Sequence, residues 1–447
     1  MKKSLPNIAI IGQANVGKSS LFNRLVGTRQ AIVAKEAGTT RDNVVAKIKL
    51  GQKISWLVDT AGLKDPTDEF EANIQDQINE AVQIADAIMV VVDSTLHPTQ
   101  DDRNIAKTAL RNKKPVILVV NKTDLKSSVD QSEFLHLGIK DIFYTSANHN
   151  RGIDELVAHL EKIIPEGKDK DDTNKIKVAF IGRPNVGKSF LFNTLAGKQQ
   201  AIVANIAGTT RDLNRITLNY HNQAIEFIDT AGYRKPGKQE VGIEKFSVLR
   251  TLQAIEEADI CVLVIDGTEY STQLDHKLAG IIDEAGRGLI IAISKSDLIP
   301  KKETKDLIMR RITQDFQFTP YAPLIFTSSI TGKNVAKLFD LTIKIMTNRN
   351  QKVPTRQLNQ ILAEAKLKHP PAGLKNTYPK LRYVVQTDNN PPWFVFYGSS
   401  LKYLHWSYKR YLDGIIRDHF DFTGTPIKFS FRDEKQINRN RTEHLTN

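Results

Sequence analysis

The sequence is poor in cysteine and lacks any long hydrophobic segment. Its 447 residues contain one cysteine, Cys261, which excludes an internal disulfide and predicts a thiol packed in a core. No apolar run approaches the roughly 18 residues that a transmembrane helix needs, so we expect no association with a membrane. The apolar run behind Met1-Lys2-Lys3 is too short for a signal peptide. These absences favour a reducing, cytoplasmic location.

Acidic residues are also in deficit, and the deficit is uneven along the chain. The net charge is +13, and residues 351–447 carry +8 of it, with 16 Lys/Arg against 8 Asp/Glu. A small basic unit joined to less charged domains suggests a polyanionic partner, most often a nucleic acid. An ordinary lysine-rich, solvated surface is the alternative interpretation.

One glycine-containing motif occurs twice. Both copies have the phosphate-loop form, in which two glycines enclose four residues and Lys-Ser follows: Gly12, Gln13, Ala14, Asn15, Val16, Gly17, Lys18, Ser19, and Gly182, Arg183, Pro184, Asn185, Val186, Gly187, Lys188, Ser189. Glycine lets backbone N–H groups curl around phosphates, lysine reaches the outer phosphates, and serine is a ligand for Mg²⁺. Each copy follows a strand-length apolar run and precedes apolar residues at helical spacing, which is the context that the motif requires.

The similarity between the two copies extends far beyond the phosphate loop. Asp59-Thr60-Ala61-Gly62 recurs as Asp229-Thr230-Ala231-Gly232, at the same offset of 170 residues as the loops. A period of this length indicates a duplicated domain. We therefore expect a first domain over residues 1–164, a charged linker over 165–175 and a second domain over 176–348. A small domain over 351–435 and a flexible tail over 436–447 complete the prediction.

Apolar runs alternate with amphipathic stretches in both copies. The expected strands include residues 54–58, 87–92, 116–120 and 142–144, and then 224–228, 260–265, 289–293 and 324–326. This alternation predicts an α/β fold, a mostly parallel sheet with helices on both faces, and a ligand at the carboxyl ends of the strands. The small domain is expected to be α+β, with helices near 358–365 and 401–415 and strands at 381–385, 393–397 and 427–431.

The base-binding motif follows the expected strand 116–120 and reads Asn121, Lys122, Thr123, Asp124. An aspartate can accept hydrogen bonds from the ring N–H and the amine of guanine, whereas adenine would leave the carboxylate unpaired. Here the sequence resembles the translation-factor-related GTPases, whose base-reading motif is Asn-Lys-x-Asp. Their fifth motif, which also touches the base, is matched by Ser146 and Ala147.

The resemblance implies further roles. Thr40 and Thr210 stand where these GTPases keep the threonine that ligates Mg²⁺ beside the γ-phosphate, although a turn threonine is the alternative. Asp59 and Asp229 would hold Mg²⁺ through water. Gly62 and Gly232 would sense the γ-phosphate. The residues that follow are Leu63 and Tyr233; neither can orient water as glutamine does, so we expect slow intrinsic hydrolysis.

Two phosphate-loop asparagines leave two interpretations open. Asn15 and Asn185 resemble the asparagine of potassium-activated GTPases, which helps to bind a K⁺ that replaces an arginine finger. Alternatively, each asparagine merely tolerates a left-handed backbone in its loop.

The complete order of motifs resembles the tandem-domain GTPases of the Der (EngA) family over nearly the whole chain. The resemblance implies a monomeric GTPase that binds GTP and GDP with Mg²⁺ and acts in assembly of the large ribosomal subunit, in contact with its rRNA. Lys18, Thr40, Lys188 and Thr210 are the expected catalytic residues. A nucleotide-gated scaffold with negligible turnover and a GTPase partner of a tRNA-modifying enzyme are the alternatives.

The second copy departs from the family pattern. Its base-reading motif is Ser294, Lys295, Ser296, Asp297, and its fifth motif is Ser328, Ser329. Because a serine hydroxyl makes fewer hydrogen bonds than an amide, we expect weaker guanine binding at the second site. Phe190, which replaces a small residue after Ser189, is expected to pack in the core.

The last domain resembles the KH-like domain that closes the family's proteins. KH domains clamp nucleic acid with a Gly-x-x-Gly loop, and residues 351–447 contain none. Docking against the second GTPase domain is therefore a plausible role beside RNA contact. Tyr403, Trp406, Tyr408 and Tyr411 are expected to pack in a core or interface rather than to stack on bases.

Overall fold

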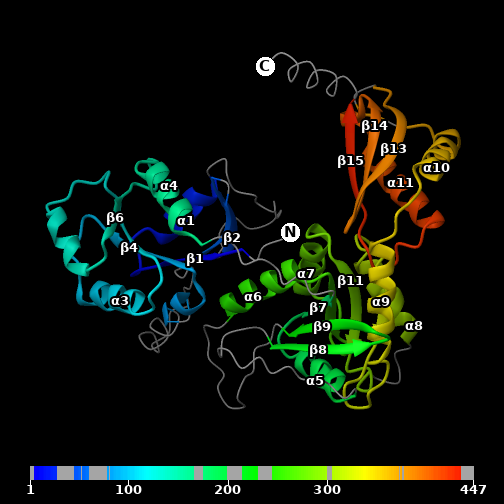
Figure 1. Ribbon diagram of the computed structural model, residues 1–447, viewed down its shortest axis with the longest axis horizontal. Helices are drawn as coiled ribbons and strands as arrows, with labels where there is room; N and C mark the ends of the chain where they lie inside the picture. Colours follow the sequence, from blue (N-terminus) through cyan, green and yellow to red (C-terminus); the bar gives the residue numbers. More distant parts are fainter. Residues whose placement is uncertain are drawn as a thin grey trace. The chain divides into compact units, whose positions relative to one another are not determined.

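Figure 1 shows a computed structural model of the chain. It describes residues 5–27, 45–51, 53–59, 78–79, 81–165, 175–198, 214–229, 244–299, 305–371, 373–374 and 377–433. The chain divides into two compact units, residues 1–173 with 234–253 and residues 174–233 with 254–447. Among the helices in the ranges just given, none combines the length and the apolar character needed to cross a membrane.

The first unit contains a six-stranded sheet with the strand order β2-β3-β1-β4-β5-β6. Its elements are β1 (Asn7–Ile11), α1 (Lys18–Gly27), β2 (Val45–Leu50), β3 (Lys53–Asp59), β4 (Ala87–Asp93), α3 (Gln100–Leu110), β5 (Val116–Asn121), η1 (Gln131–Leu137), β6 (Asp141–Tyr144) and α4 (Ile153–Ile163). All neighbours pair in parallel except β2 and β3. One face packs against α1 and α4 and the other against α3, as Figure 1 shows, so the predicted α/β class is confirmed.

The second unit repeats this sheet with the order β12-β11-β10-β7-β9-β8. Its elements are β7 (Lys175–Ile181), α5 (Lys188–Lys198), β8 (Asn214–Tyr220), β9 (Gln223–Asp229), β10 (Ile260–Asp266), α7 (Gln273–Glu284), β11 (Gly288–Ser294), α8 (Lys305–Asp315), β12 (Leu324–Phe326) and α9 (Lys337–Arg349). The division between the units falls within α6 (Glu244–Glu257), whose residues up to 253 belong to the first unit. Every residue of β10 is buried because helices cover both faces of the sheet. Cys261 lies in this strand with no exposed surface, as expected, and burial raises the pKa of its thiol to about 12.

Two strands were absent from the prediction. β2 and β8 form antiparallel hairpins with β3 and β9 at the sheet edge. Four of the six residues in β2 are partly or fully exposed, and polar and apolar residues alternate along most of the strand instead of forming an apolar run. The long apolar signal that marks the central parallel strands is therefore missing at these edges.

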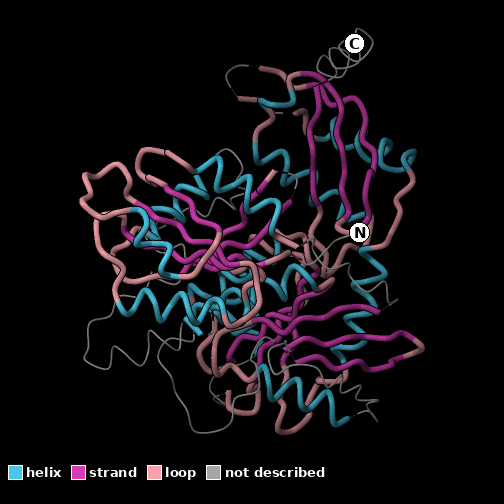
Figure 2. The backbone as a smooth tube through the Cα atoms, turned by 60° about the vertical axis from the view of Figure 1, so that its left-hand side comes forward, coloured by secondary structure: helices cyan, strands magenta, loops and turns pink. Residues whose placement is uncertain are grey.

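The last part of the second unit is a three-stranded sheet with two helices on one face. Its elements are α10 (Thr355–Lys368), β13 (Lys380–Asn389), β14 (Pro392–Ser399), η2 (Leu401–Tyr403), α11 (Trp406–His419) and β15 (Lys428–Asp433). β14 pairs antiparallel with β13 and parallel with β15. The three strands of this sheet lie side by side at the upper right of Figure 2. The α+β prediction is confirmed, but residues 401–403 form a 3-10 turn, and the helix begins only at Trp406.

This small domain is docked on the second sheet domain. Arg349, at the end of α9, has no exposed surface and donates hydrogen bonds to the Gly286 carbonyl at 3.0 Å and to Thr425 Oγ1 at 3.3 Å. The amide of Leu289 in β11 donates to the Gly424 carbonyl at 2.9 Å. Lys428 Nζ donates to the carbonyl of Asp283 at 2.8 Å. Contacts from a helix end, a strand and a loop therefore hold the two domains in one arrangement.

Candidate nucleotide-binding sites

The first phosphate loop joins β1 to α1, as the motif requires. Gly12 has a φ of 149° and Gly17 a φ of 94°, in the range that favours glycine. A Cβ atom on Gly12 would lie 2.3 Å from the Val91 carbonyl oxygen, and one on Gly17 would lie 2.2 Å from Asn121 Nδ2. Both backbone conformation and close neighbours therefore require glycine at these two positions.

Lys18 folds back over the loop that precedes it. Its ammonium group donates to the carbonyl of Gly12 at 2.8 Å and to that of Gln13. Burial lowers the pKa of Lys18 to about 8, and the carboxylates of Asp59 and Asp102 oppose this effect. A buried ammonium that donates to loop carbonyl groups is a site at which a phosphate would be strongly stabilised.

Two of the three residues predicted to hold magnesium in the first site, Ser19 and Asp59, lie together. Ser19 Oγ donates a hydrogen bond of 2.8 Å to Asp59 Oδ2, at the carboxyl end of β3. A hydroxyl and a carboxylate fit the preference of Mg²⁺ for oxygen ligands. The carboxylate of Asp59 is almost fully buried, so a cation beside it would offset an otherwise costly charge.

The fourth motif connects three segments of the first site through one side chain. Asn121, at the end of β5, donates from Nδ2 to the Val16 carbonyl at 3.2 Å, in the phosphate loop. Its Oδ1 accepts from Thr145 Oγ1 at 3.2 Å and from the amide of Ala147 at 3.1 Å, in the fifth motif. Because Asn121 is 2% exposed, these bonds are protected from water.

Asp124 lies beside the fifth motif, where a base-reading carboxylate is expected. Its Oδ1 accepts from Ser146 Oγ at 2.5 Å, and His149 Nε2 lies 3.5 Å from Oδ2. The hydrogen bond from Ser146 is the largest influence lowering the pKa of Asp124, so the carboxylate is ready to accept hydrogen bonds. Lys122 has a φ of 68° and its Nζ donates to Asp93 Oδ2 at 2.6 Å, which joins the turn after β5 to the end of β4.

The second phosphate loop repeats the main features of the first. Lys188 Nζ donates to the Gly182 carbonyl at 2.8 Å and to the Arg183 carbonyl at 2.6 Å. Arg183 replaces Gln13, and its guanidinium pairs with Glu269 at 3.1 Å and with the buried Asp275 at 3.2 Å. These ion pairs tie the second loop to the start of α7.

Ser294 makes fewer connections than Asn121. Its hydroxyl lies within donating distance of the Val186 carbonyl, at 2.6 Å, and of the Ile265 carbonyl, at 3.0 Å. Thr327, the counterpart of Thr145, donates instead to the Ile293 carbonyl at 3.4 Å. Within the described residues, Ser294 thus reaches the phosphate loop but not the fifth motif.

The side chain of Ser294 is shorter than that of Asn121 and leaves space beside Gly187. A Cβ atom there would meet Ser294 at 3.9 Å, an ordinary contact, whereas the same atom on Gly17 would clash with Asn121. Asp297 is exposed, and the described residues include no hydrogen-bond or ion-pair partner for its side chain, in contrast with Asp124. The second base-binding region is therefore less tightly connected before nucleotide binds.

The fifth motif is attached to the helix after each phosphate loop in a different way. Arg24 Nε donates to the Ala147 carbonyl at 2.7 Å in the first domain. In the second domain Thr194 Oγ1 lies 3.2 Å from the Ser329 carbonyl, so a short hydroxyl replaces a guanidinium. The prediction that Phe190 packs in the core is wrong, because its side chain is 72% exposed. α5 already presents Leu191 and Phe192 to the core, and Phe190 lies on its outer side.

The two phosphate-loop asparagines both adopt the left-handed backbone. φ is 64° at Asn15 and 63° at Asn185. This geometry agrees with the structural interpretation of these residues and does not test potassium binding. Several predicted site residues lie outside the described ranges: Thr40, Thr60, Ala61, Gly62, Leu63, Thr210, Thr230, Ala231, Gly232 and Tyr233.

Comparison with known proteins decides the family. A family model described as "50S ribosome-binding GTPase" matches residues 7–122 and 177–295, and one described as "KH-domain-like of EngA bacterial GTPase enzymes, C-terminal" matches residues 352–432. GTPase Der of Thermomicrobium roseum is 39% identical over 97% of both chains, and that of Chloroflexus aggregans is 40% identical over 96% of this chain and 98% of its own. The chain belongs to the Der family of GTPases. Membership implies that its two G domains bind GTP.

Solved structures of other GTPases also resemble parts of this Der-family chain. The G domain of the T. maritima FeoB iron transporter is 28% identical, with 38% of this chain and 98% of that chain covered and a TM-score of 0.28. Era in complex with MgGDPNP and part of 16S ribosomal RNA is 24% identical, with 58% and 93% covered and a TM-score of 0.31.

The sequence prediction missed one pair of supporting residues in these Der-type sites. Asp93 and Asp266 end β4 and β10 and hold Lys122 and Lys295 through hydrogen bonds of 2.6 Å. Each carboxylate also caps its own turn by accepting from the amide two residues later at 2.9 Å. The signal was present, because both strands end in Asp-x-Thr at matching places of the duplicated domain.

Proposed function

We propose that this chain is a cytoplasmic GTPase that binds the large ribosomal subunit during its assembly and hydrolyses GTP slowly at two sites. The observation that carries this proposal is the repeated set of a phosphate loop, a buried lysine and a base-reading loop at the carboxyl ends of two six-stranded sheets. The description of the matching family model, "50S ribosome-binding GTPase", supports the large subunit as the partner.

Each site residue has a proposed role. Lys18 and Lys188 stabilise charge on the outer phosphates, and Asp124 and Asp297 select guanine. Ser19 and Asp59 in the first site, with Ser189 and Asp229 in the second, would hold Mg²⁺, which neutralises phosphate charge. Thr40 and Thr210 would add a ligand that depends on the γ-phosphate, and loss of that phosphate would release their segments.

Hydrolysis is proposed to be slow because of the residues after Asp-Thr-Ala-Gly. Leu63 and Tyr233 cannot position water as a glutamine amide does. If Asn15 and Asn185 bind K⁺, GTP hydrolysis measured in KCl will exceed that in NaCl. Equal rates in the two salts would remove potassium from the proposal and leave the two guanine sites intact.

Co-sedimentation with ribosomal particles tests the partner. The chain should pellet with large subunits in a nucleotide-dependent manner, and a non-hydrolysable GTP analogue should give more bound protein than GDP. Particles should also raise GTP turnover if the chain acts as an enzyme. Equal pelleting with both nucleotides, and turnover unchanged by particles, would contradict a nucleotide-gated ribosomal role.

A further inference from the structure

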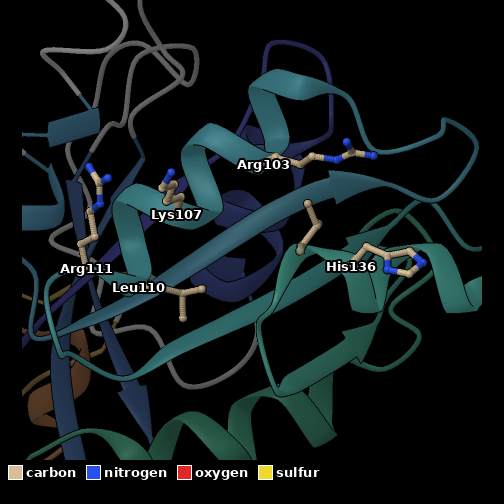
Figure 3. Close-up of a pocket in the computed structure, with 6 residues that line it drawn as sticks. Arg103, Lys107, Leu110, Arg111 and His136 are labelled. Carbon is tan, nitrogen blue, oxygen red and sulfur yellow. The ribbon is translucent and has the colours of Figure 1, made fainter.

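Helix α3 of the first G domain carries three cations on one face. Arg103, Lys107 and Arg111 are spaced four residues apart, so successive side chains lie about 6 Å apart along the helix. All three are exposed. Together with Leu110, His136 and Leu137 they line a hollow of about 480 Å³ between α3 and η1, here called the α3–η1 hollow (Figure 3).

The positive charge of the α3–η1 hollow is not neutralised. Across the described ranges, Arg103, Lys107 and Arg111 form no ion pair and donate no side-chain hydrogen bond. Two nearby acids are engaged elsewhere: Asp102 accepts from the amide of Thr99 at 2.9 Å, and Glu133 lies 2.6 Å from His97. Among the residues that the structure describes, no carboxylate lines the hollow. The field there is therefore available to an anion from outside the chain.

The duplicated domain shows that the fold does not require these cations. Matching capping boxes, Thr99 with Asp102 and Thr272 with Asp275, align α3 with α7. The aligned positions hold the following pairs: Arg103 and His276, Lys107 and Gly280, Arg111 and Glu284. The second helix thus forms the same fold without the basic face.

The corresponding end of α7 is covered by the KH-like domain. Asp283 accepts a hydrogen bond from Tyr321 Oη at 2.6 Å, and its backbone carbonyl accepts from Lys428 at 2.8 Å. Leu110 occupies the matching place on α3 and is 42% exposed. The same end of the fold is therefore acidic and docked in the second G domain, whereas in the first it is basic and exposed among the residues that the structure describes.

We propose that the α3–η1 hollow binds the phosphate backbone of RNA. Arginine matches phosphate oxygens in a bidentate manner, and lysine adds a mobile point charge. The side chain of Leu110 and the buried Leu137 give the hollow an apolar base against which a sugar can lie. The inference rests on the proposed ribosomal function and assigns it a contact surface on the first G domain.

The test is charge reversal in the full-length protein. The variant combines Arg103→Glu, Lys107→Glu and Arg111→Glu, and the matched control combines Arg310→Glu, Lys337→Glu and Lys368→Glu, three exposed cations of the second unit. The probes are purified large ribosomal subunits and a short mixed-sequence RNA, each measured over a range of KCl concentrations. GDP affinity, measured in parallel, should stay unchanged in both variants because neither set touches a nucleotide site.

The hollow variant should bind RNA at least about tenfold more weakly than the control. Its log–log salt slope should fall by about 2 to 3, since each lost phosphate contact removes roughly 0.7 to 0.9. A slope and affinity equal to those of the control would overturn the inference. The inference would also be overturned if the hollow variant lost affinity for polyglutamate by as large a factor as it lost affinity for RNA, because the surface would then recognise acidic protein.

The outcomes separate this inference from the proposed function. If the wild-type protein binds the short RNA but not the subunits, and the hollow variant binds that RNA more weakly than the control does, the ribosomal role is contradicted while the hollow keeps its assignment. Wild-type protein that binds both probes, with a hollow variant that behaves like the control, would contradict only the hollow.

Discussion

The two G domains share a sheet order, a phosphate loop and a lysine held by loop carbonyls, yet their base-binding regions are assembled differently. In the first, Asn121 joins the phosphate loop to the fifth motif with hydrogen bonds of 3.1 to 3.2 Å. In the second, Ser294 reaches the phosphate loop at 2.6 Å, and its neighbour Thr327 bonds elsewhere. Loops that are connected before binding need less ordering when the ligand arrives. One side chain can thus make duplicated sites unequal without altering the fold.

The domains differ again at the helix that follows the fourth strand in each sheet. The end of α7 receives the KH-like domain through the carbonyl of Asp283, which accepts from Lys428, and through Gly286, where a Cβ atom would lie 2.9 Å from Pro391 Cγ. In contrast, Arg103, Lys107 and Arg111 at α3 are exposed. Duplication supplied two equivalent surfaces, and their sequences now favour different partners. Substitutions that change these differences one at a time show which of them affect stability and which affect nucleotide binding.

The largest effect is expected at the docking contact that only the second domain has. Gly424→Ala places a Cβ 2.2 Å from Ile345 Cγ1, at a φ of 74°. Overpacking and backbone strain together should lower the free energy of unfolding by about 3 kcal/mol. Hydrogen exchange should report faster opening across the second unit while the first sheet domain keeps its protection.

Gly414→Ala is the matched control for this substitution. Gly414 lies in α11, and a Cβ there meets nothing within 4 Å, so alanine should stabilise the helix by about 0.5 to 1 kcal/mol. If the Gly424→Ala substitution left hydrogen-exchange protection across the second unit unchanged, the docking contact would not be strained by a side chain at this position.

The next effect is expected on guanine binding at the first site. Asn121→Ser removes the acceptor for Thr145 and for the Ala147 amide, which become buried groups without their partner. A loss of about 2 to 3 kcal/mol, or roughly 30- to 150-fold in GDP affinity, should follow. Titration calorimetry measures it, with the exposed Asn104→Ser as the control. A GDP affinity within a factor of two of the wild type would contradict the role of Asn121 in joining the phosphate loop to the fifth motif.

The reverse exchange should have a smaller effect. Ser294→Asn can place an amide in the space beside Gly187, where the present contact is 3.9 Å. One or two new hydrogen bonds should tighten GDP binding at the second site by about 1 kcal/mol, or roughly fivefold. The measurement uses a Lys18→Ala background, in which the first site is disabled. Weaker binding would mean that the second site has adapted to serine.

The smallest effect concerns acid stability of the docked domain. Asp421 accepts from the amide of Thr423 at 2.9 Å and pairs with Lys344 at 3.1 Å, and hydrogen bonding to Thr423 is the main influence that lowers its pKa to about 2. Because this pKa lies below the usual aspartate pKa of about 3.9, the carboxylate contributes stability above about pH 4, which is lost as pH falls through 2.

The pair is half exposed, so its contribution should be below about 1 kcal/mol. Asp421→Asn should therefore melt slightly earlier than the wild type at pH 6, and the difference should vanish as pH approaches 2. A difference that grows on acidification would contradict the assigned direction.

Sequence predicted the fold where apolar runs are long and the motifs where their spacing is rigid. β4, β5, β10 and β11 are buried throughout or nearly so, and each was expected from its run. The phosphate loops lie directly after β1 and β7, where their motif predicts them, because few other local structures fit the glycine spacing of that motif. Edge strands β2 and β8 were missed because one side of each faces solvent, and such alternation is short and weak.

Side-chain partners were the part that sequence could not supply. Phe190 was placed in the core because aromatic residues favour burial, but neighbouring Leu191 and Phe192 already occupy the inward face of α5. The fully buried Arg349 carries no sequence signal that separates it from a surface arginine. The sequence predicts that Ser294 weakens guanine binding at the second site. Only the structure shows that Ser294 makes no hydrogen bond to the fifth motif among the described residues.

Calorimetric titration of the nucleotide-free, full-length chain with GDP tests the central claim most directly. The account predicts two guanine sites per chain, with the tighter one abolished by Lys18→Ala and the weaker one by Lys188→Ala. A single site, equal affinities, a tighter second site, or ATP binding as strong as that of GTP would contradict it.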